Sequence, residues 1–149
     1  MTGTNHFLTG SLIGLTVHQP VLAITLAFGS HFLLDSLPHY GDDNHTGKKF
    51  LAILAVDAMF ISIALGLFAL TQPVHWPLAI ACGLAASSPD LMWLPNWLNE
   101  MRGHGKQPLN NMVERFHKRI QWGEKPKYWP VEIVWTAFMA LALVNVAKF

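Results

Sequence analysis

Residues 50–70, FLAILAVDAMFISIALGLFAL, form a long apolar run that restricts what this chain can fold into. A helix needs about 20 apolar residues to cross the hydrocarbon core of a bilayer, and the run has that length. Residues 76–98 and 128–147 form two further runs, the first of them interrupted by SSPD. Only 13% of the residues are charged and 52% are hydrophobic, whereas globular proteins average about 25% charged. These features predict an all-α integral membrane protein.

Two shorter apolar segments precede the long runs. Residues 5–17 stop at HQP, and residues 21–37 stop before Pro38, because the residue before a proline is biased away from the helical conformation. We expect them to form a tight helical hairpin that the other helices partly shelter. The sequence thus predicts one membrane-embedded domain over residues 1–149, with about four to five embedded helices. The alternative is a compact soluble α-bundle with unusually apolar helices.

An amphipathic helix is predicted within residues 108–122, PLNNMVERFHKRIQW. The apolar residues recur at helical spacing; they are Leu109, Met112, Val113, Phe116 and Ile120. The basic residues fall on the polar side; they are Arg115, Lys118 and Arg119. A helix of this kind can lie in the membrane interface with its basic side near lipid head groups. It can equally cover the bundle as a soluble amphipathic helix, and the sequence leaves both interpretations open.

The basic residues also predict an orientation. Nine of the ten lysines and arginines lie in two connections, before residue 50 and between residues 102 and 127. Cytoplasmic loops carry an excess of lysine and arginine. We therefore expect residues 40–49 and 99–127 to face the cytoplasm and residues 71–75 to face the outside.

Composition excludes some classes of function. A net charge of +1, without a basic block interleaved with aromatic residues, gives no support for nucleic-acid binding. The single cysteine, Cys82, excludes an internal disulfide and a cysteine-based zinc site. The chain has eight histidines, in contrast to one cysteine and two tyrosines.

The stretch HFLLDSLPHYG, residues 31–41, holds the most informative of these histidines. His31 and Asp35 are four residues apart, so they project from one side of a helix at a spacing that can offer two ligands to one ion. His39 would lie two turns on, unless Pro38 ends the helix and lets it fold back or serve a second ion. Imidazole with carboxylate suits zinc, manganese or iron. The plainer alternative is a hydrogen bond on the helix surface, but ionisable groups in apolar segments are costly and indicate function.

Other polar residues join this candidate site through the predicted orientation. In SSPDL, Ser88 can cap a helix that starts at Pro89, and the same break can bring Asp90 to a metal. Asp57 needs a partner inside the bundle and is expected either to support the ligands of the site or to be structural. The candidate metal ligands all fall near the cytoplasmic face; they are His6, His31, Asp35, His39, Asp90 and His117.

This pattern resembles a known family. An N-terminal histidine before a glycine-containing helix, then HxxxDxxPH, then a PD after small residues, is similar to small bacterial inner-membrane metal-dependent hydrolases. Those proteins are grouped with zinc-dependent phospholipase C and P1 nuclease. The resemblance implies a multi-pass protein of the bacterial inner membrane. It also implies that the six candidate ligands form a metal site, with FHKRIQW as a second histidine motif.

We therefore expect a membrane-bound hydrolase that uses a divalent metal, most simply zinc, on a lipid or small phosphoester at the cytoplasmic face. Asp35 or Asp90 can act as general base if it is not a ligand. One alternative is a non-catalytic membrane protein that binds or conducts a metal ion or protons. In such a protein, Asp57 would be the next polar group on the path below the candidate site. A further alternative is a structural adaptor that docks a partner through the amphipathic helix.

Overall fold

The computed structural model describes residues 1–42, 44–105 and 112–147, and this part of the chain is helical, with no strand. The elements follow one another along the chain as α1 Gly3–Thr16, α2 Pro20–Asp35, α3 Lys48–Thr71, α4 Trp76–Ser87, the 3₁₀ helix η1 Ser88–Trp93, α5 Leu94–Met101, α6 Met112–Ile120, the 3₁₀ helix η2 Pro126–Tyr128 and α7 Trp129–Ala147. The predicted all-α class is confirmed.

Three helical stretches are long and apolar enough to cross a membrane, which indicates a membrane protein. They are Lys48–Thr71, Trp76–Met101 and Pro126–Ala147. The first has 24 residues, about 36 Å at 1.5 Å per residue. Large apolar side chains on it face outward, for example Leu70 at 85% exposure. The helix α2 is apolar but shorter, so the count of four to five embedded helices stays a prediction.

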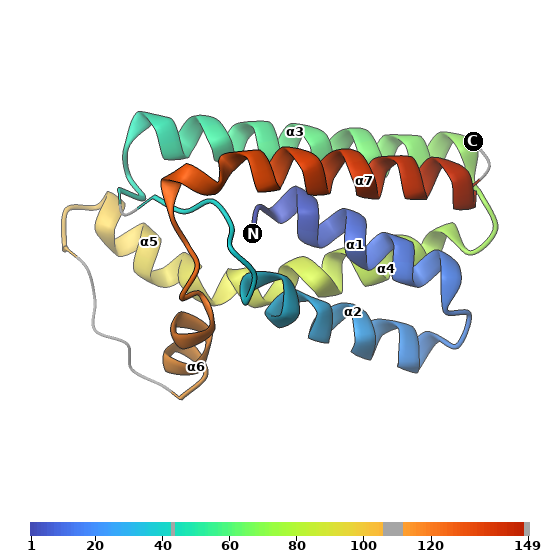
Figure 1. Ribbon diagram of the computed structural model, residues 1–149, viewed down its shortest axis with the longest axis horizontal. Helices are drawn as coiled ribbons and strands as arrows, with labels where there is room; N and C mark the ends of the chain where they lie inside the picture. Colours follow the sequence, from blue (N-terminus) through green and yellow to red (C-terminus); the bar gives the residue numbers. More distant parts are fainter. Residues whose placement is uncertain (43, 106–111, 148–149) are drawn as a thin grey trace.

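The first helix lies in the centre of the bundle, between α7 on one side and α2 and α4 on the other (Figure 1). Two of its glycines, in a GxxxG spacing, explain the close approach to α4, because small residues let helix backbones come close together. A Cβ atom on Gly14 would lie 2.6 Å from Ala79 Cα, and one on Gly10 would lie 2.7 Å from Ala86 Cβ and against the carbonyl of Cys82. Cys82 is buried.

The N-terminal end of α1 is held by two carboxylates from the long helices. Asp57 of α3 accepts hydrogen bonds from the backbone N–H groups of Gly3 (2.6 Å) and Thr4 (3.0 Å). Glu132 of α7 accepts from Thr2 N–H at 3.0 Å and from Asn5 Nδ2 at 2.7 Å. A helix N-terminus favours negative charge. Asp57 therefore has a structural role, one of the two expected from the sequence.

The SSPD interruption of the fourth segment is a 3₁₀ helix of six residues, η1, between α4 and α5. Its N-cap is Ser87, without a side-chain cap. The hydroxyl of Ser88 instead donates to the carbonyl of Ala85 at 2.9 Å. The prediction that Ser88 caps a new helix was therefore wrong, because the chain continues from α4 with a tighter winding. Such a stretch inside a helix often marks a functional position, and here it carries Asp90.

The amphipathic helix is present as α6, while Leu109 and the predicted start at Pro108 lie outside the described residues. Its apolar side chains are largely exposed: Met112 is 85% exposed, and Phe116 is 53% exposed although its ring lies 5.9 Å from that of Phe32. The helix lies beside the C-terminal end of α2 and runs across the direction of α3 and α7 (Figure 1). This arrangement favours the interfacial interpretation over a helix that covers the bundle.

Candidate metal centre

The core of the candidate site is the last turn of α2. His31 and Asp35 are both fully buried, and His31 Nε2 lies 3.3 Å from Asp35 Oδ2. Large apolar residues elsewhere on α2 are exposed, with Val21 at 71% and Leu33 at 67%. The helix therefore presents apolar residues outward and its two ionisable residues inward.

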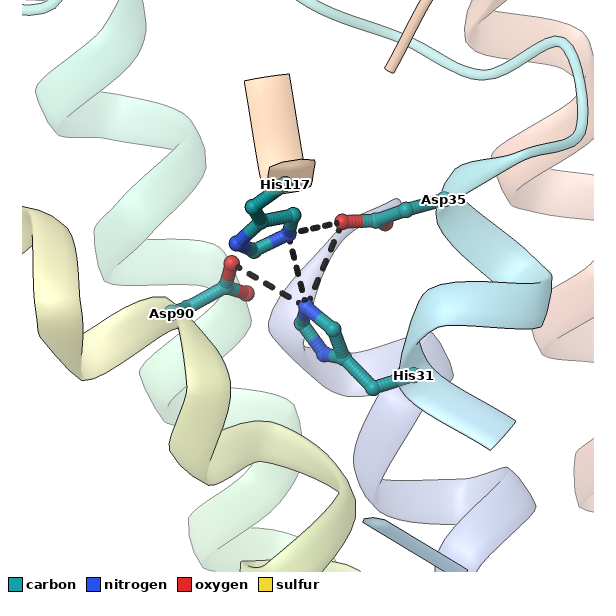
Figure 2. A group of neighbouring side chains, drawn as sticks. All are labelled: His31, Asp35, Asp90 and His117. Atoms are coloured by element: carbon teal, nitrogen blue, oxygen red, sulfur yellow. Dashed lines mark hydrogen bonds and ion pairs between the residues drawn. The ribbon is translucent and has the colours of Figure 1, made fainter. Parts of the chain in front are cut away.

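Two other elements complete the group. The 3₁₀ helix η1 brings Asp90, and α6 brings His117 (Figure 2). One ligand atom from each of His31, Asp35, Asp90 and His117 can be chosen so that all four lie within 4.8 Å of one another. Residues 90 and 117 are far in sequence from residues 31 and 35, so the fold assembles this group, which can hold a metal ion.

A backbone contact fixes the proton on His31. Its Nδ1 lies 2.8 Å from the carbonyl oxygen of Ala86, which can only accept, so Nδ1 carries the hydrogen. In the neutral ring, Nε2 is then unprotonated. Yet Nε2 faces Asp35 Oδ2 at 3.3 Å and Asp90 Oδ1 at 3.6 Å, both of which are acceptors. This nitrogen can be satisfied by a metal ion, by a second proton on the ring or by a hydrogen from His117 Nε2, which lies 3.0 Å away.

His117 reaches the group from α6. Its Nε2 lies 2.8 Å from Asp35 Oδ2 and 3.0 Å from His31 Nε2, and its Nδ1 lies 3.1 Å from the sulfur of Met92. Two imidazole Nε2 atoms and carboxylate oxygens thus converge on one point, which is the donor set of a site for zinc or a similar ion.

Asp35 is the centre of the hydrogen-bond network. Its Oδ2 also accepts from Gln121 Nε2 at 3.2 Å. Its other oxygen, Oδ1, faces His6 Nε2 at 3.1 Å and the amino group of Met1. Outer partners of this kind orient a carboxylate that binds a metal.

His6 lies beside the group and not within it. Its ring stacks on that of His31 with centroids 4.0 Å apart, and the side chain is fully buried. Its Nδ1 has no hydrogen-bond partner among the described residues. The geometry fits His6 as the residue that orients Asp35, a role different from the ligand role expected from the sequence.

The structure does not bring His39 into the group. The helix α2 ends at Asp35, and His39 instead pairs through its backbone with the turn before η2: its N–H donates to Gly123 O at 3.4 Å and its carbonyl accepts from Lys125 N–H at 3.0 Å. Its Nδ1 lies 2.7 Å from Leu37 O. Burial lowers the pKa of His39 below the usual value for histidine, so the ring is held neutral. Here His39 fixes a loop.

Of the six expected ligands, the fold brings four together, sets His6 against one of them and leaves His39 aside. Neither Gln121 nor Met92 was expected at the site. The position of Gln121 could have been predicted from the sequence, because it follows His117 by four residues and shares its side of the helix. The contact of Met92 could not, since it depends on the 3₁₀ winding of η1.

Asp90 lies on the side of the group that is accessible from outside the bundle. Its side chain is 38% exposed, whereas those of His31, Asp35 and His117 are buried. Its contact with His31 is the one ion pair that it makes among the described residues. The group is therefore closed on the bundle side and accessible at Asp90.

Two histidines lie at the other end of the bundle. His18 and His75 stack with ring centroids 4.4 Å apart and line a hollow of about 280 Å³. Neither contacts the four-residue group.

Comparison of the chain with protein-family models, with curated proteins and with solved structures found no match. The resemblance to membrane metal-dependent hydrolases therefore stays a prediction from the motifs.

Proposed function

We propose that the chain is a membrane-bound metal-dependent hydrolase whose centre consists of His31, Asp35, Asp90 and His117. The observation that supports this most strongly is the convergence of the His31 and His117 Nε2 atoms on Asp35 Oδ2, at 3.3 Å and 2.8 Å. The Nε2 of His31 is unprotonated in the neutral ring and faces carboxylate oxygens, an arrangement that a cation stabilises in a buried site.

The donor set favours a metal ion over extra protons on the rings. Two imidazoles and two carboxylates are typical ligands of zinc, and manganese or iron accept the same types. The orienting contacts also match: the Nδ1 of His31 donates to a carbonyl, as metal-binding histidines commonly do with their second nitrogen. When bound, such an ion would lower the pKa of water toward about 7 and polarise an ester or phosphoester.

The residues have separable roles in this proposal. His31, His117 and Asp35 would hold the ion, because they are buried and fixed by neighbours. Asp90 is the better candidate for the general base, because it is partly exposed while Asp35 is engaged by His6, His117 and Gln121. A base must reach the proton that it removes, and Asp90 is the carboxylate that a substrate can approach.

The position of the centre suggests the substrate class. It lies at the end of the bundle where α2 ends and α7 begins (Figure 1), and the basic connections assign this end to the cytoplasmic face. A hydrolase at the head-group level of the bacterial inner membrane would act on a lipid or a small phosphoester.

The main alternative is a protein that binds or conducts a metal ion or protons without catalysis. It needs polar groups that continue below the centre, and Asp57 was expected to be the next group on such a path for ions or protons. The Asp57 carboxylate is used instead to cap α1, through Gly3 and Thr4. This contact favours the hydrolase.

Hydrolysis can be tested with the detergent-purified protein, zinc and a panel of chromogenic phosphoesters and fluorogenic phospholipids. We expect turnover with at least one substrate, loss of turnover in Asp90→Asn with zinc still bound, and normal turnover in the His75→Ala control. Zinc binding without turnover of any substrate would favour the non-catalytic alternative.

A further inference from the structure

The helix α6 has two sides with different partners. His117 is fully buried against the centre, whereas Met112, Val113 and Phe116 are 85%, 56% and 53% exposed. An amphipathic helix normally buries its apolar side. Here the polar side chains His117 and Gln121 face the bundle, and the apolar side stays largely exposed, although the ring of Phe116 lies beside that of Phe32.

The exposed side of α6 also carries positive charge. Arg115, Lys118 and Arg119 are exposed, and Glu114 is the one acidic residue of the helix. Lys118 Nζ pairs with Glu124 at 3.1 Å. Arg115 and Arg119 contact no carboxylate of the described residues, so they are available to an anionic partner.

The attachment of α6 to the bundle centres on the candidate metal site. His117 contacts Asp35 at 2.8 Å and His31 at 3.0 Å, and Gln121 contacts Asp35 at 3.2 Å. Beside them, the rings of Phe116 and Phe32 lie 5.9 Å apart. A change in how α6 docks must therefore change the position of His117 and Gln121 in the site.

We infer that α6 binds anionic lipid head groups and that this contact docks His117 and Gln121 in the centre. Anionic lipid and the metal ion would then bind cooperatively. The inference rests on the proposed metal centre. Its physical basis is linkage: if lipid favours the docked position of α6 and the ion requires it, each must raise the affinity of the other by the same factor.

A lipid surface fits this face better than a protein groove does. An apolar stripe flanked by basic side chains is the composition of helices that lie in the membrane interface. The helix also runs across the direction of α3 and α7, beside the end of α2 (Figure 1). This places its long axis in the plane of the membrane if α3 and α7 span it.

The test compares zinc affinity in nanodiscs of pure phosphatidylcholine with nanodiscs in which a third of the lipid is phosphatidylglycerol. Zinc affinity is measured by competition with a chromophoric chelator. The variant is the triple substitution Arg115→Gln, Lys118→Gln and Arg119→Gln. The matched control removes three other basic charges of the same predicted face, through Lys48→Gln, Lys125→Gln and Lys127→Gln. Because anionic lipid concentrates zinc near any site, only the difference between variants is decisive.

We expect anionic lipid to raise the zinc affinity of the wild type and of the control about tenfold more than that of the α6 variant. A dye on Met112→Cys, in a Cys82→Ala background, should report a less polar environment in anionic nanodiscs, and the α6 substitutions should remove this shift. Equal lipid-dependent gains in all three proteins would overturn the coupling while leaving the metal centre intact. A missing dye shift would overturn the lipid contact. Absence of zinc binding in either lipid would contradict the proposed function itself.

Discussion

At His31, the contact between Nδ1 and the carbonyl of Ala86 decides which nitrogen meets the carboxylates. Spacing along α2 predicts that His31 and Asp35 share one side of the helix, but it does not show which ring nitrogen is free. That information comes from α4, whose C-terminal turn supplies the carbonyl. The chemistry of this residue is thus set by a contact between elements that are distant in the sequence.

His6 provides a prediction at the same scale. Replacing it with alanine removes the contact with Asp35 Oδ1 but leaves the four-residue group in place. We expect His6→Ala to weaken zinc binding about 10- to 100-fold, the usual effect of losing an outer partner. Isothermal titration with zinc measures this, and His75→Ala at the other end of the bundle is the control. Complete loss of binding would show that His6 is itself a ligand.

At the scale of elements, Asp57 links α3 to the start of α1. We expect Asp57→Asn to lower the free energy of unfolding by about 1–3 kcal/mol, because hydrogen bonds from two backbone N–H groups lose their charged acceptor. Zinc content should stay the same. Denaturation in detergent micelles and metal analysis test both parts. The control is Ser62→Ala, since the Ser62 hydroxyl contacts only its own helix, at Ala58 O among the described residues. Unchanged stability, or lost zinc, would contradict this role.

The packing of α1 against α4 can be tested at Gly10. A methyl group there would overlap the backbone of Cys82 and the side chain of Ala86. We expect Gly10→Ala to destabilise the protein by about 1–3 kcal/mol through overpacking. Gly29→Ala is the matched control: Gly29 is also helical, but a Cβ atom there has no neighbour within 4 Å. Equal stabilities of the two variants would exclude close packing at Gly10.

The sequence predicted the elements better than their contacts. The long helices α3 and α7 follow directly from their apolar runs. The direction of α6 could not be predicted, because its apolar stripe suggested the opposite side for packing. The position of His39 was also undetermined, since Pro38 showed that the helix ends but not where the chain goes next.

At the scale of the whole molecule, the orientation in the membrane remains to be tested. The two basic connections predict that the candidate metal centre faces the cytoplasm. In a Cys82→Ala background, we expect an impermeant maleimide added outside intact cells to label Gln72→Cys but not Thr46→Cys. Permeabilised cells should show labelling of both, which controls for accessibility. The reverse pattern in intact cells would place the centre outside.

The most direct test of the proposed metal centre is X-ray absorption spectroscopy of the purified protein with one equivalent of zinc. We predict a spectrum of two imidazoles and carboxylate oxygens, with metal–ligand distances of about 2.0–2.2 Å. The double variant His31→Ala, His117→Ala should lose the bound zinc, while the double variant His18→Ala, His75→Ala should retain the wild-type spectrum. A protein that binds no zinc, or whose spectrum survives the loss of His31 and His117, would contradict the existence of this centre.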